Sequence, residues 1–394
     1  MPRRLLLLNT DLEIGGTPTV VRELALRLRS SEVQTHVACL AALGPVGADL
    51  TAAGVPVTAF DARSRFDLSV LPRLIWLLRR DRFDAILSFL VHANAIAALA
   101  HTWHRGGAGR WFQSIQTTQP TPRWHWHLQA LAARSAEKII VPSPSVAWCA
   151  MHWADVPAEK LVVIPNGLTM EEFTPSPGTP GEGRGVGFRE EAAPTLPCRN
   201  YRWTRGGEKS GDKTLAQSPL RIGFIGRLDP VKRIGDLVAA TAILGQGYRL
   251  DIFGEGVERP RIEAQIAALQ LMGRATLRGA IARPAEALAN MDVLVLPSAA
   301  EGFGLVLIEA MAAGVPVVAS DAPGICDVVS PGPPSQTGLL VPVGAISALA
   351  AAIRSVRDDP AAWRERTAEA RREVERRYTW SRVVPMYRAV LGLS

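Results

Sequence analysis

Short apolar runs alternate with longer amphipathic stretches over the first 165 residues. Runs typical of buried strands, rich in Leu, Val and Ile, occur at 5–8, 33–40, 55–60, 85–89 and 138–141. Helical spacing separates several of them, beginning at 17–28, where Pro18 lies in a favourable first-turn position. This alternation predicts a parallel sheet with helices on both faces.

The pattern stops after Phe173 and starts again near Leu220. Residues 174–218 are rich in Pro, Gly and charge without a sustained period, which predicts a disordered insertion within a linker at 166–218. Predicted strands then follow at 221–225, 249–254, 275–277 and 292–297, with helices near 234–244 and after Glu258. We therefore expect two α/β halves, 1–165 and 219–375. Ligands of open parallel sheets lie outside the carboxyl ends of the strands, so the site is expected between the halves.

Composition narrows the class of protein. The 394 residues are 47% hydrophobic and 21% charged, as in an ordinary two-domain soluble chain. The apolar stretch 83–104 is interrupted by Asp84, His92 and Asn94, which argues against a membrane span. Four scattered cysteines form no metal-binding spacing and fit a reducing cytoplasm. The net charge of +7 suits nucleotide phosphates or an anionic membrane face, but no dense basic run interleaved with aromatics indicates nucleic acid.

The segment 292–321 contains the most informative candidates for ligand binding. A predicted strand ends near Pro297, Glu301-Gly302-Phe303-Gly304 reads as a turn, and helical spacing follows from Leu305 to Ala313. A helix that starts there would present unpaired N–H groups to a phosphate or a sugar oxygen. Glu301 is expected at this mouth, and Glu309 about two turns along on roughly the same side.

Two cations follow the strand that restarts the pattern. Arg227 and Lys232 flank the loop GRLDPVKR, where they could converge on a diphosphate. A pair of solvated loop residues is the alternative. No Asp-x-Asp, GxSxG or HExxH pattern occurs in the chain, so no metal clamp, hydrolase elbow or metalloprotease helix is expected.

Polar and aromatic residues of the first half offer a second set of candidates. His92, followed closely by Asn94, comes directly after a predicted strand and is either a packed core histidine or part of a polar site. Trp124, Leu128 and Leu131 have helical spacing beneath a polar face, which fits core packing or contact with an acceptor or a membrane surface.

With these residues in place, the chain resembles the family 4 retaining glycosyltransferases, which have the GT-B fold of two facing Rossmann-like domains. The likeness covers nearly all of the chain except 174–218. Its motifs, specific in their order and spacing, are IGG at 14–16, PNG at 165–167, GRL with a downstream KR at 226–233, FGEG at 253–256, PS at 297–298, E-x7-E at 301–309 and GVPVVASD at 314–321.

The resemblance implies a role for each motif. Arg227 and Lys232 would hold the diphosphate of a nucleoside diphosphate sugar, and Glu309 its ribose. Glu301, with the backbone of Gly302, Phe303, Gly304 and Leu305, would hold the sugar and its leaving phosphate, while Gly15 and Gly16 would approach from the first half. Residues 378–391 should form a helix that crosses back, so that 376–394 joins the N-terminal domain.

One departure from the family concerns the proton acceptor. Many relatives have a histidine where this chain has Gln116, and glutamine cannot accept a proton at neutral pH. His92 is therefore the preferred polar residue on the acceptor side.

The predicted reaction is metal-independent sugar transfer, with retention, to a glycan or lipid-linked acceptor, with no cofactor beyond the donor. The predicted location is the cytoplasm, with peripheral contact to the membrane as an option. A nucleotide-sugar epimerase of the same architecture and a non-catalytic carbohydrate-binding relative are the alternatives.

Overall fold

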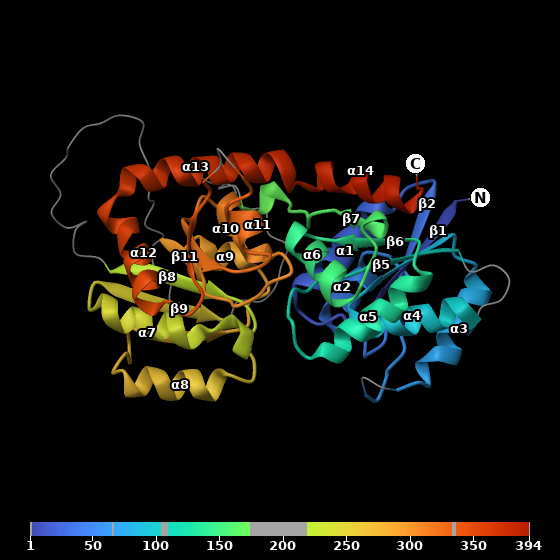
Figure 1. Cartoon of the computed structure of the whole chain (residues 1–394), viewed down its shortest axis with the longest axis horizontal. Helices are drawn as coiled ribbons and strands as arrows, with labels where there is room; N and C mark the ends of the chain where they lie inside the picture. The colour runs from blue at the N-terminus through green and yellow to red at the C-terminus, as the bar shows by residue number, and fades with distance from the viewer. Residues whose placement is uncertain (1, 65–66, 104–108, 174–218, 333–335, 394) are drawn as a thin grey trace.

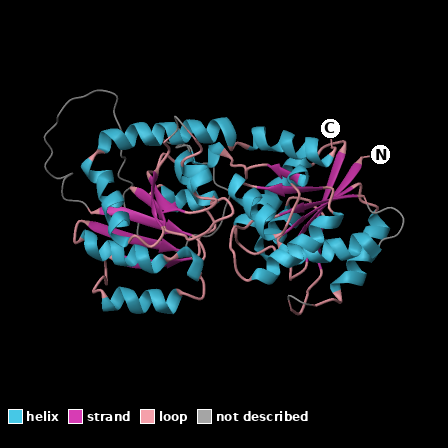
Figure 2. Cartoon of the chain, in the orientation of Figure 1, coloured by secondary structure: helices cyan, strands magenta, loops and turns pink. Residues whose placement is uncertain are grey.

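The computed structural model describes residues 2–64, 67–103, 109–173, 219–332 and 336–393, which form two α/β lobes (Figure 1). Among these residues the N-terminal lobe has a seven-stranded sheet in the order β3-β2-β1-β4-β5-β6-β7, and the C-terminal lobe a six-stranded sheet in the order β10-β9-β8-β11-β12-β13. Every neighbouring pair of strands is parallel. Helices cover both faces of each sheet (Figure 2).

The strands are β1 Arg3–Asn9, β2 Val33–Cys39, β3 Val57–Ala59, β4 Ala85–Phe89, β5 Arg110–Ser114, β6 Lys138–Val141, β7 Leu161–Val163, β8 Leu220–Ile225, β9 Tyr248–Phe253, β10 Ala275–Gly279, β11 Val293–Leu296, β12 Val317–Asp321 and β13 Leu339–Pro342. The helices are α1 Gly16–Leu28, α2 Gly44–Ala52, α3 Val70–Asp81, α4 Val91–Trp103, α5 Arg123–Ser135, α6 Pro144–Trp153, α7 Ile234–Leu244, α8 Arg259–Ala268, α9 Pro284–Leu288, α10 Leu305–Ala312, α11 Cys326–Val329, α12 Ile346–Asp358, α13 Pro360–Arg377 and α14 Trp380–Leu391.

The first strand shows why the N-terminal sheet is covered on both faces. Leu5 and Leu7 pack into the core shared with α1, α2 and α14, whereas Leu6 and Leu8 pack into the core shared with α3 to α6. All four leucines are completely buried. Because successive side chains of a strand point to opposite faces, an uninterrupted apolar run is what a two-sided core requires.

Two chain crossings between the lobes lie side by side. The N–H of Leu168 donates to the carbonyl of Tyr378 at 2.6 Å, and the N–H of Trp380 donates to the carbonyl of Leu168 at 3.3 Å. Beyond this bridge α14 packs onto the N-terminal lobe through Trp380 and Tyr387. Figure 1 shows α13 and α14 nearly end to end along the top of both lobes.

The two parallel-sheet halves expected from the sequence are confirmed, with differences in detail. The strand expected at 55–60 covers only Val57–Ala59. β5 was not predicted, because its Gln113 and Ser114 look like surface positions although both are completely buried. The proposed insertion at 174–218 lies outside the described residues.

Within the part of the chain described here, no helix is both long and apolar enough to cross a bilayer.

We expect Gly167→Ala to destabilise the junction between the lobes. A Cβ at this position would lie 2.4 Å from the Trp380 ring, so the ring or the crossing must shift. Such overpacking costs about 1–3 kcal/mol of the free energy of unfolding, measurable by urea denaturation. Gly235→Ala is the matched control, because its new methyl group meets only the far end of the Gln265 side chain. Equal stability of the two variants would contradict the prediction.

Candidate functional site

A partly buried ion pair joins two of the expected site residues. The Nζ atom of Lys232, at the end of the 3₁₀ turn Pro230–Lys232 that follows β8, donates to Oε1 of Glu301 at 2.6 Å. Only 16% of the Lys232 side chain and 12% of the Glu301 side chain are exposed. Screening by water is weaker at such exposure than at the surface, so the pair fixes the orientation of both side chains.

Arg227 lies on the same loop but has a different environment. Its guanidinium pairs with Asp229 at 3.0 Å, and 69% of the side chain is exposed. Exposed pairs contribute about 0–1 kcal/mol, so an incoming phosphate can compete with Asp229 for this cation. The structure thus brings Lys232 and Glu301 together and leaves Arg227 at the rim.

The FGEG segment supports this cationic loop from behind. The N–H of Gly226 donates to the carbonyl of Phe253 at 2.9 Å, and the N–H of Leu228 to that of Glu255 at 2.9 Å. A Cβ on Gly254 would lie only 1.9 Å from the carbonyl oxygen of Gly226. The glycine allows the two backbones to touch, which gives the motif a structural explanation.

Helix α10 begins beside the ion pair. Gly304 precedes its first residue with φ 80°, a left-handed conformation that glycine adopts without strain. The first amides of the helix have no partner within it and carry a partial positive charge. Phe303, in contrast, is buried, and its ring meets that of Tyr378 edge to face, so its side chain serves the core.

The position of Glu309 differs from expectation. Helix α10 begins at Leu305, as the spacing predicted, so Glu309 lies just over one turn into it rather than the expected two turns. Burial raises the pKa of Glu309 to about 7, and repulsion from Glu172 adds to the rise. Glu172 belongs to the short 3₁₀ turn Met170–Phe173, which packs against α10.

Hydroxyl groups of the N-terminal lobe hold the turn that carries Glu301. Thr118 Oγ1 donates to the carbonyl of Glu301 at 2.7 Å, and Ser143 Oγ donates to that of Gly302 at 3.0 Å. A Cβ on Gly302 would come within 2.1 Å of the carbonyl oxygen of Gln116. Thr118 and Ser143 were not predicted from the sequence. Both follow the carboxyl end of a strand, β5 or β6, where site residues are expected, but a hydroxyl that donates to a backbone carbonyl has no recognisable sequence motif.

The glycine loop of the N-terminal lobe faces the start of α10. The carbonyl of Gly15 accepts the N–H of Thr19 at 3.0 Å, which begins α1. A Cβ on Gly16 would lie 3.3 Å from Cδ1 of Leu305, and Leu305 packs against the cores of both lobes. The starts of α1 and α10 therefore approach each other across the interface.

His92 occupies the first turn of α4, and its ring lies near two aromatic rings of α5 in the same lobe. Its centroid lies 5.9 Å from that of Trp124 and 5.8 Å from that of His125, both at the start of α5. Nearby Asn94 is buried, accepts from Ser88 Oγ at 2.7 Å and donates to Gln129 Oε1 at 3.0 Å. Asn94 therefore serves the internal structure of the lobe, and an acceptor-side role for His92 stays a prediction.

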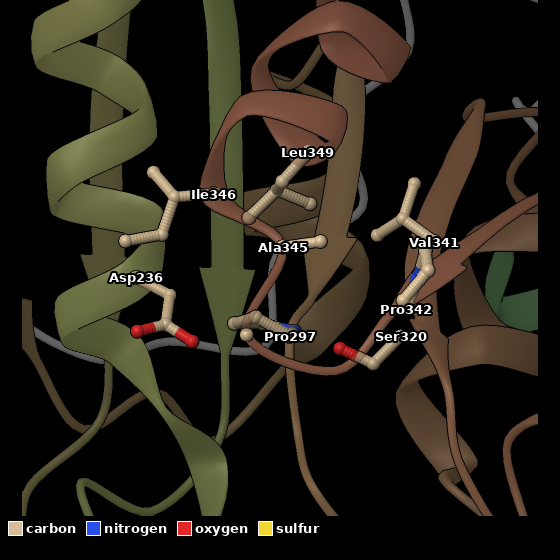
Figure 3. A pocket seen from close by; sticks show the side chains of 9 residues that line it. Asp236, Pro297, Ser320, Val341, Pro342, Ala345, Ile346 and Leu349 are labelled. Atoms are coloured by element: carbon tan, nitrogen blue, oxygen red, sulfur yellow. The ribbon is translucent and has the colours of Figure 1, made fainter.

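A small hollow at the carboxyl ends of β11 to β13 does not add a ligand site. Asp236, Ser320 and Ile346 are among the side chains that line it, between α7 and α12 (Figure 3). The hollow has no room for a water molecule, so it is too small for a ligand. Among the described residues, no three His, Cys, Asp or Glu side chains group as metal ligands.

Comparison with known families agrees with this geometry. The model described as "Glycosyltransferase Family 4" matches residues 14–172, and the one described as "Glycosyl transferases group 1" matches residues 208–374. The chain belongs to glycosyltransferase family 4. The resemblance drawn from the motifs is thereby confirmed.

Curated relatives match over part of their length. Glycogen synthase of Mycobacterium tuberculosis is 37% identical over 171 residues, which are 42% of this chain and 40% of the relative. A GDP-mannose-dependent alpha-mannosyltransferase of Mycolicibacterium smegmatis is 37% identical over 218 residues, or 51% of this chain and 54% of the relative. The match thus spans about half the length of these relatives.

Solved structures establish the fold. Anabaena HepE in complex with UDP and glucose aligns over 100% of both chains with a TM-score of 0.80 and 20% identity. Sucrose-phosphate synthase from Thermosynechococcus elongatus aligns over 100% of both chains with a TM-score of 0.76 and 21% identity. The expected GT-B fold is confirmed.

We expect Gly302→Ala to hold the lobes apart. The new methyl group would collide with the Gln116 carbonyl, so the bonds from Thr118 and Ser143 must lengthen. Small-angle scattering should show a larger radius of gyration. Thr118→Val, which removes one of these bonds without added bulk, should change it less. An unchanged radius in Gly302→Ala would refute the steric argument.

We expect Glu309→Gln to stabilise the protein above pH 7. With a folded pKa of about 7 against an ordinary 4.5, Glu309 stabilises the fold at low pH and loses that contribution as the pH rises through 7. The variant should gain roughly 1–3 kcal/mol at pH 8 and little at pH 4, measured by urea unfolding. Exposed Glu263→Gln is the control. If Glu309→Gln raised the free energy of unfolding equally at pH 4 and pH 8, the effect would not come from the raised pKa of Glu309.

Proposed function

We propose that the protein transfers a sugar from a nucleoside diphosphate donor to an acceptor hydroxyl, with retention at the anomeric carbon and without a metal ion. The observation that carries the proposal is the Lys232–Glu301 pair beside the start of α10. It combines a cation, a carboxylate and unpaired amides, as a sugar linked to a diphosphate requires.

Each part of the donor has a candidate partner. Lys232 and Arg227 bind the diphosphate, Glu301 and the backbone of residues 302–305 bind the sugar and the leaving phosphate, and Glu309 binds the ribose. Donor phosphates that reach Lys232 must share it with Glu301, so the carboxylate keeps the cation in place before the donor arrives. The relatives support such a donor, since one is named for dependence on GDP-mannose and solved structures contain UDP or UDP-glucose.

The leaving phosphate gains charge as the glycosidic bond breaks. The two cations and the first amides of α10 stabilise that charge more in the transition state than in the ground state. Gln116 has no basic group, and its side-chain amide donates to Ser114 Oγ at 2.8 Å. The leaving phosphate therefore takes the acceptor proton in this proposal, and His92 orients the acceptor.

The acceptor is a glycan or a lipid-linked precursor of the cell envelope, reached from the cytoplasm with peripheral contact to the membrane. Gly15 and Gly16 allow it close to the donor, because they add no side chain at the interface. The donor base and sugar can be found by screening nucleoside diphosphate sugars for thermal stabilisation, since binding raises stability by mass action.

We expect Lys232→Ala to lower turnover at least about 100-fold with the donor found in that screen. The variant loses the phosphate partner and leaves Glu301 without its cation. Product formation by mass spectrometry, with and without acceptor, gives the rate, and the anomeric proton signals of the product give the stereochemistry.

The control is Arg278→Ala, which removes an exposed ion pair to Asp251 on the same lobe and should leave turnover unchanged. Wild-type turnover in folded Lys232→Ala would reject the assignment. Conversion of the donor sugar without any acceptor would instead identify an epimerase.

A further inference from the structure

Three neighbouring helices of the N-terminal lobe present one continuous outer surface. Helices α3, α4 and α5 pack side by side, with α4 between the other two. Their inner side chains, such as Leu74, Ala97 and Ala132, enter the core beneath them. Figure 1 shows the three helices along the lower side of this lobe, away from α14. We call their outward residues the α3–α5 face.

Large apolar side chains project from this face. Trp76 on α3 is 59% exposed, Trp103 on α4 is 65% exposed and Leu131 on α5 is 57% exposed. Leu99, one turn before Trp103, is also exposed. Tryptophan at a surface suits a boundary between water and an apolar phase, because its ring is apolar and its N–H is polar.

The charges on the face have one sign. Its exposed arginines are Arg73, Arg79 and Arg80 on α3 and Arg123 and Arg134 on α5. Over the three helices, all of whose residues the structure describes, the single carboxylate is that of Asp81, which is 8% exposed and paired with Arg80 at 2.7 Å. The Arg80 guanidinium also lies 4.5 Å from the centroid of the Trp76 ring. A partner of this face must therefore be both anionic and apolar.

The face leads to the interface between the lobes. Helices α4 and α5 begin beyond the carboxyl ends of β4 and β5, where His92 and Trp124 meet. Both helices then run back along the sheet, so Trp103 at the end of α4 and Arg134 near the end of α5 lie away from that edge, whereas Arg123 opens α5 at it. Arg123 is therefore the part of the α3–α5 face that lies nearest to His92 and the interface.

We propose that the α3–α5 face docks the protein onto a bilayer that contains anionic phospholipid. Phosphates of the head groups accept from the arginines, while Trp76, Trp103 and Leu131 enter the boundary of the acyl chains. This inference deepens the acceptor side of the proposed function and rests on it for the identity of a lipid-linked acceptor. The lipid contact itself is measured separately from sugar transfer.

The test is co-sedimentation of the full chain with vesicles of phosphatidylcholine alone or mixed with equal phosphatidylglycerol. Wild-type protein should pellet with the mixed vesicles and dissociate as salt is raised. The double variant Trp76→Ala with Arg79→Gln should bind them about tenfold more weakly. The matched control, Met272→Ala with Arg261→Gln, removes one exposed apolar group and one arginine from the other lobe and should bind like wild type.

Thermal stabilisation by the donor nucleotide should be equal in all three proteins, so failure of the docking face is distinguishable from failure of the donor site. The proposal is overturned if wild-type protein sediments with neither kind of vesicle, or equally with both. If both double variants lose vesicle binding equally, the α3–α5 face is not the binding surface. Binding to duplex DNA that Trp76→Ala with Arg79→Gln abolishes, without any pelleting on vesicles, would assign the face to nucleic acid.

Discussion

The site depends on how the backbone at Glu301 and Gly302 is held. The carbonyls of these two residues accept from Thr118 and Ser143 of the opposite lobe, while the Glu301 side chain accepts from Lys232 of its own lobe. Backbone and side chain are thereby fixed by different parts of the molecule. The orientation of the following amides, and with it the start of α10, is consequently linked to the relative position of the two lobes.

This arrangement places charge where water is scarce. A carboxylate and an ammonium group removed from water are costly unless each finds its partner, and Lys232 and Glu301 satisfy this condition mutually. Glu309 has no comparable cation among the causes of its raised pKa, which are burial and the charge of Glu172. Carboxylates with such shifted pKa values are concentrated at functional sites, and in the proposed function the hydroxyl groups of the ribose would hydrogen-bond to Glu309.

The sequence predicted the parts of this architecture that depend on local pattern. Apolar runs such as 5–8 identified central strands, because burial on two faces leaves no polar position. The strand β5 was not predicted because it contains buried polar residues. The side-chain amide of Gln113 finds its partner in Gln129 of α5, and the backbone carbonyl of Ser114 in Asn94 of α4, both distant in sequence. The motif at 301–309 predicted the helix start at Leu305, where α10 begins, but not the ion pair between Glu301 and Lys232, which are 69 residues apart in the chain. Contacts between lobes, such as that of Thr118, were beyond any local rule.

The two lobes divide the chemistry unevenly, and the division has a physical reason. The C-terminal lobe contributes the Lys232–Glu301 ion pair and the helix terminus, which suit a highly charged ligand. The N-terminal lobe contributes small residues and hydroxyls at the interface, and arginines with tryptophans outside it. In the proposed function the charges of the C-terminal lobe hold the donor, whereas Thr118 and Ser143 bring the opposite lobe against the turn that carries Glu301. Approach of the two lobes around a bound donor would therefore complete the environment of the leaving phosphate when the acceptor is delivered, and this order disfavours transfer to water.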